Sequence, residues 1–99
     1  MIKHIVMWKL AETAESAHKA TNAKLMKKML ENLKLKIPEV VTVEVGINSN
    51  KGEMWDVVLT TEFKSMEDLN RYQAHPAHQE VVEFVKKVRT DRAAVDYEE

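Results

Sequence analysis

Two side chains capable of acid–base chemistry, Tyr72 and His78, flank a proline step at His75-Pro76. A proline disfavours the α conformation for the residue before it and suits the first position of a helix. We therefore expect one helix to end near Ala74 and another to begin at Pro76, so that the phenol and the imidazole converge across the bend. A neutral imidazole accepts a proton and a phenol donates a hydrogen bond, which are the parts needed for general acid–base catalysis.

The same motif has a purely structural interpretation. His75 and His78 can satisfy backbone groups that are left unpaired at the two helix ends, and Tyr72 can pack in the core. A metal site formed by His4, His75 and His78 is a further alternative, but a His-x-x-His pair around a proline lacks the i, i+4 spacing of helical ligands. We predict neither a metal nor a cofactor, because the chain also lacks a glycine-rich phosphate loop.

The composition indicates one small domain with no bias toward nucleic acid or membranes. The 99 residues, 44% of them apolar, suffice for one hydrophobic core, and the net charge is -1. Cysteine is absent, which excludes disulfides and thiol chemistry. No apolar run approaches the roughly 18 residues of a membrane span. The first residues lead directly into a strand pattern without a signal sequence, so we expect a cytoplasmic protein.

Hydrophobic periodicity predicts the elements that must position these groups. Alternation of apolar residues predicts strands over residues 2–10, 40–47, 54–63 and 92–97. Helical spacing predicts a long helix over residues 17–35, with Thr13 or Ser16 as its N-cap. A second helical segment, over residues 65–88, is expected to begin at a Ser65 cap and to break at Pro76.

The order of these elements, β-α-β-β-α-β, is that of the ferredoxin-like α+β fold, a four-stranded antiparallel sheet with helices on one face. The strands carry apolar residues on both faces, although the helices can cover only one. In the first strand, for example, Val6 and Trp8 alternate with Ile5 and Met7. A large uncovered apolar face is rare in a soluble monomer, so we expect a homodimer that packs sheet against sheet.

Four segments resemble the stress-responsive α/β-barrel (Dabb) family, in the order in which that family has them. They are residues 1–9, residues 63–69, the Tyr-x-x-His-Pro-x-His element of residues 72–78, and residues 95–97. The resemblance covers essentially the whole chain. It implies a single domain over residues 1–99 and a dimeric α+β barrel, formed where two four-stranded sheets meet.

The resemblance also implies roles for individual residues. In the family's plant polyketide cyclase, the positions matching Tyr72 and His78 form the catalytic pair, and the position matching His4 lines the pocket. Val57 stands where that cyclase has another pocket histidine. For this chain we expect a ligand pocket lined by His4, Val6, Trp8, Trp55, Val57 and His75.

Two functions follow from these observations and stay open at this point. The first is a homodimeric module that binds a small hydrophobic or aromatic ligand without catalysis. The second is a cofactor-independent cyclase, isomerase or lyase, with His78 as the general base and Tyr72 as the acid.

Overall fold

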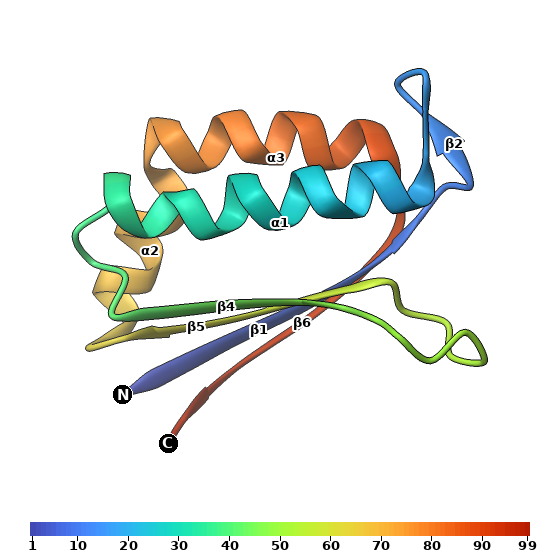
Figure 1. The fold of residues 1–99 in the computed structure, drawn as a ribbon. Coiled ribbons are helices and arrows are strands. Elements are labelled where there is room, and N and C mark those ends of the chain that lie inside the picture. The colour runs from blue at the N-terminus through green and yellow to red at the C-terminus, as the bar shows by residue number, and fades with distance from the viewer.

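The protein folds as one antiparallel sheet covered on one face by helices (Figure 1), and the computed structural model describes all residues, 1–99. The elements in chain order are β1 (Ile2–Leu10), β2 (Thr13–Ala14), β3 (Ala17–His18), α1 (Lys19–Lys36), β4 (Thr42–Ile47), β5 (Val57–Phe63), α2 (Met66–Ala74), α3 (Pro76–Val88) and β6 (Arg89–Glu98). The four long strands have the order β4-β5-β1-β6, and every neighbouring pair is antiparallel. This arrangement confirms the predicted ferredoxin-like α+β fold.

The core lies between the sheet and the helices. Alternate residues of β1, from His4 to Leu10, are buried on the inner face, and their register places them beside the buried residues Val57, Leu59 and Thr61 of β5. Helices α1 and α3 run side by side across this face, while α2 covers one end of it (Figure 1). None of the helices combines the length and the apolar character that a membrane span requires.

The outer face of the sheet carries apolar side chains that no element of the chain covers. Ile5 and Met7 of β1 are half-buried, whereas Val58 of β5 and Val95 of β6 are 36% and 55% exposed. The register pairs Met7 with Val58 and Ile5 with Val95. These four side chains therefore form an apolar patch, which we call the outer-face patch, on the side opposite the helices.

The segment between β1 and α1 differs from the prediction, which expected a polar turn with Thr13 or Ser16 as a helix cap. The chain instead forms a small hairpin, β2 and β3, in which Ala14 pairs with Ala17. Glu15 and Ser16 occupy its two-residue turn with φ angles of 49° and 61°, values typical of a type I′ turn. Helix α1 then begins at Lys19, after His18, with no side-chain cap, so both proposed caps were wrong.

The third strand begins at Val57, although the alternation predicted a start at Met54. Residues 48–56 form a loop that is held to the sheet by Asp56. The Asp56 N–H donates to the Trp8 carbonyl at 2.9 Å, and its carboxylate accepts the Leu10 N–H at 2.8 Å. Trp55 lies in this loop and is therefore not on the strand face to which the prediction assigned it.

The boundaries of two other strands also differ from the prediction. The second strand begins at Thr42 rather than at residue 40, and the last strand runs over Arg89–Glu98 rather than over residues 92–97. Strand β6 is longer because it pairs along all of β1, from Ile2 with Glu98 to Leu10 with Arg89. Its polar composition conceals this pairing in the sequence.

Candidate ligand-binding and acid–base site

The site is organised by the bend between α2 and α3. Helix α2 begins at a Ser65 cap, whose hydroxyl accepts the Asp68 N–H at 3.1 Å, and it ends at Ala74, as predicted. His75 has extended backbone angles (φ -66°, ψ 136°), and its Nδ1 accepts the Ala77 N–H at 3.0 Å. His75 is thus the N-cap of α3, so its accepting nitrogen is committed to the helix end and not to a ligand.

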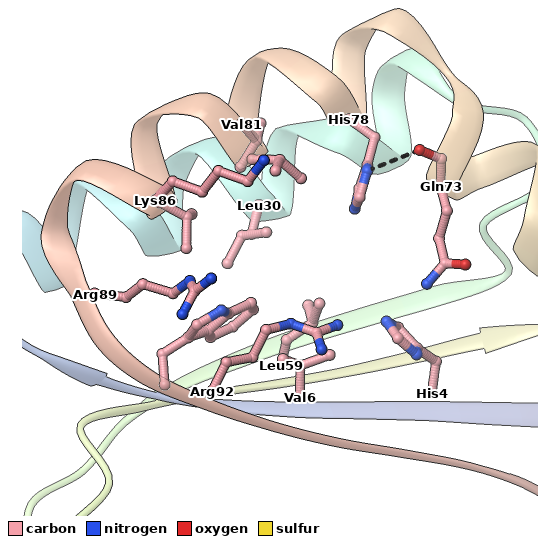
Figure 2. Close-up of a pocket in the computed structure, with 13 residues that line it drawn as sticks. His4, Val6, Leu30, Leu59, Gln73, His78, Val81, Lys86, Arg89 and Arg92 are labelled. Atoms are coloured by element: carbon pink, nitrogen blue, oxygen red, sulfur yellow. Dashed lines mark hydrogen bonds between the residues drawn. The ribbon is translucent and has the colours of Figure 1, made fainter.

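The first turn of α3 places His78 back against the end of α2. Its Nδ1 lies 3.2 Å from the carbonyl oxygen of Gln73. A carbonyl can only accept, so Nδ1 carries a proton and donates it to this bond, and the neutral ring keeps an unprotonated Nε2. The bend therefore selects one tautomer of His78 and leaves a basic nitrogen for a ligand (Figure 2).

The surroundings of His78 keep this imidazole neutral. Burial is the main cause that lowers the pKa of His78 below 6.5, and electrostatic interactions with His4 and Arg92 lower it further, against the raising effect of the Gln73 carbonyl. The lowered pKa agrees in direction with a histidine at a helix N-terminus, but desolvation is the leading cause. A neutral imidazole near physiological pH is available as a hydrogen-bond acceptor or as a general base.

Tyr72 lies behind His78, inside the core. Its ring centroid is 4.5 Å from that of His78, 5.0 Å from that of Phe63 and 6.4 Å from that of His4. Only 1% of Tyr72 is exposed, and this burial raises the pKa of its phenol. The phenol consequently keeps its proton and can serve as a hydrogen-bond donor.

His4 reaches the same region from β1 and is anchored by Asp96. The two residues are register partners on β1 and β6, and the His4 Nδ1 bonds to the Asp96 carboxylate. A carboxylate orients the ring and directs Nε2 away from itself. Asp96 lies in the closing segment of residues 95–97, to which the sequence pattern assigned no role in the site. The sequence signal that could have identified Asp96 is His4 itself, because a buried histidine on a strand needs a hydrogen-bond partner, which a neighbouring strand can supply.

A cavity of about 230 Å³ lies between the sheet and helix α3 (Figure 2). Of its thirteen lining residues, six are aliphatic, six are polar or charged, and one is the aromatic Trp8. The lining residues are His4, Val6, Trp8, Leu30, Leu59, Gln73, His78, Val81, Val82, Val85, Lys86, Arg89 and Arg92.

The structure brings together half of the residues expected at the pocket. His4, Val6, Trp8 and His78 line the cavity, whereas Tyr72 does not line it and lies next to the rings of His78 and His4. Trp55, Val57 and His75 do not line it. Trp55 and Val57 instead border a shallow depression near the loop of residues 48–56, because β1 lies between β5 and β6 and the cavity is on the β6 side.

Four polar residues at the cavity were not anticipated from the sequence: Gln73, Lys86, Arg89 and Arg92. Arg89 and Arg92 lie at the start of β6, a stretch whose strand character the sequence pattern conceals. Nowhere in the chain do three or more His, Asp or Glu side chains converge as a metal ion would need.

Comparison with solved structures identifies similar proteins over nearly the full chain. A protein of unknown function from Bacteroides fragilis, described as dimeric and ferredoxin-like, is 35% identical, with a TM-score of 0.89 and coverage of 98% of this chain and 94% of that one. A Dabb family protein from Mesorhizobium loti is 20% identical, with a TM-score of 0.73 over 99% and 95% of the two chains. A hydroxynitrile lyase from Passiflora edulis is 17% identical, with a TM-score of 0.76 over 97% and 90%.

No functionally curated protein matches this sequence. The family model for the stress responsive A/B barrel domain matches residues 2–99. Fold, full-length family match and the 35% identical relative agree with one another. The chain therefore belongs to the stress-responsive A/B barrel domain (Dabb) family.

Proposed function

We propose that this protein is a homodimeric domain that binds a small apolar or aromatic molecule in the cavity between the sheet and α3. The observation that carries this proposal is the combination of aliphatic walls with one unbonded acceptor, the Nε2 of His78. Ligand sites are typically concave and apolar, with a few polar groups that fix orientation. Gln73, His4 and His78 are those groups at one end of the cavity.

A dimer that packs through the outer-face patch completes this proposal. Ile5, Met7, Val58 and Val95 leave an apolar surface on the sheet, and surfaces of this kind commonly mark interfaces. The Bacteroides fragilis relative, described as dimeric, supports a homodimer for this chain without indicating which surface forms it. We also retain a cytoplasmic location as part of the proposal, since a chain without cysteine suits a reducing compartment.

Acid–base catalysis is the second candidate, as a cofactor-independent cyclase, isomerase or lyase. His78 would be the general base, because a neutral imidazole with a free Nε2 can remove a proton from carbon next to a carbonyl. Tyr72 would be the acid, through a hydrogen bond to the carbonyl oxygen. Because the Tyr72 ring lies behind that of His78, this role needs a substrate group that reaches past the imidazole. The hydroxynitrile lyase shares the fold and gives the candidate a precedent.

Binding of a small aromatic molecule is tested with phenol as the probe. At ten times its dissociation constant, phenol should stabilise the fold by about 1.4 kcal/mol, which raises the melting temperature by about 5–10 °C. The variant Val82→Trp, which places a larger side chain at the cavity wall, should lose this shift. The matched control Val43→Trp, at a half-buried position away from the cavity, should keep it. A native protein that neither phenol nor other small hydrophobic compounds stabilise at millimolar concentration would contradict the proposal.

The interface is tested by charging the outer-face patch. The double variant Val58→Lys, Val95→Lys places two desolvated cations per chain in the proposed contact. It should sediment with the mass of one chain at micromolar concentration, while the native protein sediments with the mass of two. Leu35→Lys, on the exposed surface of α1 at 86% exposure, is the matched control and should remain dimeric. A native monomer, or a double variant that stays dimeric, would rule out this interface.

Catalysis is tested by deuterium exchange at the α-carbon of phenylacetone in D₂O, followed by NMR. If His78 is the base, His78→Gln should lower the exchange rate by about 100-fold or more. Tyr72→Phe should lower it less, through loss of the hydrogen bond. His75→Asn keeps a capping acceptor and should retain activity. The pH at which the rate falls to half should lie below that of a free imidazole, because the pKa of His78 is lowered. Equal rates in the native protein and both site variants would remove these roles.

A further inference from the structure

Three cationic side chains line the cavity: Lys86 and Arg89 enter it from the end opposite His78, whereas Arg92 reaches toward the end that holds His4. Figure 2 shows Lys86 and Arg89 entering from α3 and the start of β6, and the Arg92 guanidinium extending along the cavity floor toward His4. None of the thirteen lining residues is acidic. The chain as a whole has 16 acidic and 15 basic residues, so this excess of positive charge is local.

These cations lack carboxylate partners within the chain. The third arginine, Arg71, forms ion pairs with Glu67 and Asp68 at 3.6 and 2.7 Å, whereas neither Arg89 nor Arg92 takes part in any ion pair. The same contrast separates neighbouring lysines. Lys87 lies 3.8 Å from Glu15, while Lys86, at the cavity, has no acidic partner.

Like charges around one concave surface repel one another and concentrate a positive potential in it. An anion in the cavity removes that repulsion. Arg89 is half-buried, and Arg92 and Lys86 are exposed, so an anionic group can reach them without burial of an unpaired charge. A guanidinium presents paired N–H donors that match the two oxygens of a carboxylate.

The size and the opposite end of the cavity define the rest of the ligand. An apolar cavity of about 150 Å³ holds one benzene molecule, so about 230 Å³ accommodates one ring with short substituents. The aliphatic walls formed by Val6, Leu59 and Val81 suit such a ring. At the far end, the Nε2 of His78 accepts a hydrogen bond and therefore favours a ligand hydroxyl there.

We propose that the ligand is a small aromatic carboxylate, with its carboxylate bound by Arg89 and Arg92, its ring between the aliphatic walls, and a hydroxyl directed at His78. This inference rests on the proposed binding function and adds the chemical class of the ligand. Lys86 contributes further positive charge. The arginines are specificity-determining residues, because they separate acids from neutral molecules of the same shape.

The experiment compares 4-hydroxybenzoate with its neutral counterpart 4-hydroxybenzyl alcohol by isothermal titration calorimetry on the full chain. The native protein should bind the acid at least about tenfold more tightly than the alcohol, the scale of one charge-assisted hydrogen bond. The double variant Arg89→Gln, Arg92→Gln should lose that preference and bind the alcohol within about twofold of native affinity. Acetate, which lacks the ring, should bind at least about tenfold more weakly than the aromatic acid.

Matched controls separate the cavity from general charge effects. Arg71→Gln and Lys87→Gln remove cations outside the cavity and should leave the affinity for 4-hydroxybenzoate unchanged, whereas Lys86→Gln should reduce it. Circular dichroism melting confirms that each variant is folded.

The outcomes distinguish the two levels of the proposal. If the alcohol binds as tightly as the acid, or if the arginine variant binds the acid normally, the cavity takes neutral ligands and only this inference is overturned. Equal binding of acetate and the aromatic acid also overturns it, because the ring then contributes nothing. If none of the three compounds binds, and phenol does not stabilise the fold, the proposed binding function fails as well.

Discussion

The hydrogen bond from Nδ1 of His78 to the carbonyl of Gln73 determines what the site can do, and it exists because the chain bends at His75-Pro76. Pro76 prevents α2 from continuing, and the last carbonyls of that helix are left without helical partners. Helix α3 then starts immediately, with His75 as its cap and His78 in its first turn. A carbonyl oxygen can only accept a hydrogen bond, so Nδ1 of His78 must carry the proton of the neutral ring. The bend therefore leaves Nε2 of His78 unprotonated.

The sheet supplies the chamber into which that nitrogen faces. Alternation along β1 sends His4, Val6 and Trp8 inward beneath the helices, while Ile5 and Met7 face outward. The alternation along β1 therefore supplies residues to the cavity on the inner face of the sheet, and residues to the proposed contact with a second copy on its outer face. The β6 strand contributes in the same way, since Asp96 anchors His4 and Arg92 extends along the cavity floor.

The structural and the functional interpretations of the Tyr72–His78 motif are compatible. His75 caps a helix and Tyr72 packs in the core, as a purely structural motif would require. His78 fits both interpretations, because its Nδ1 donates to a backbone carbonyl while its Nε2 is left for a ligand in the cavity. Burial keeps the imidazole neutral and the phenol protonated, through a lowered pKa for His78 and a raised pKa for Tyr72.

The parts of the fold that local patterns specify could be predicted from the sequence. Strict alternation gave β1 correctly, and the Ser65 cap and Pro76 placed the ends of α2 and the start of α3. The β2–β3 hairpin was missed because Glu15-Ser16 is an unusual pair for a turn with two positive φ angles, where Asn-Gly is typical. The start of β5 was misplaced because alternation continues into a loop that Asp56 holds in place.

The candidate site was only partly predictable, because it depends on which strands are neighbours. His4, Val6, Trp8 and His78 follow from alternation and from the bend. Trp55 and Val57 share a pattern with those residues but lie away from the β6 side of the sheet, where the cavity is. Asp96 and the three cations become meaningful only once β6 is known to pair with β1 along its full length.

The protonation state of the His78 ring tests this account most directly. A long-range ¹H–¹⁵N NMR spectrum of the native protein near pH 7 distinguishes protonated from unprotonated ring nitrogens. We predict a neutral His78 with the proton on Nδ1 and a bare Nε2, and loss of this signal pattern in His78→Gln assigns it. A His78 that is doubly protonated at pH 7, or neutral with its proton on Nε2, would contradict the central claim that the bend prepares a basic nitrogen for the cavity.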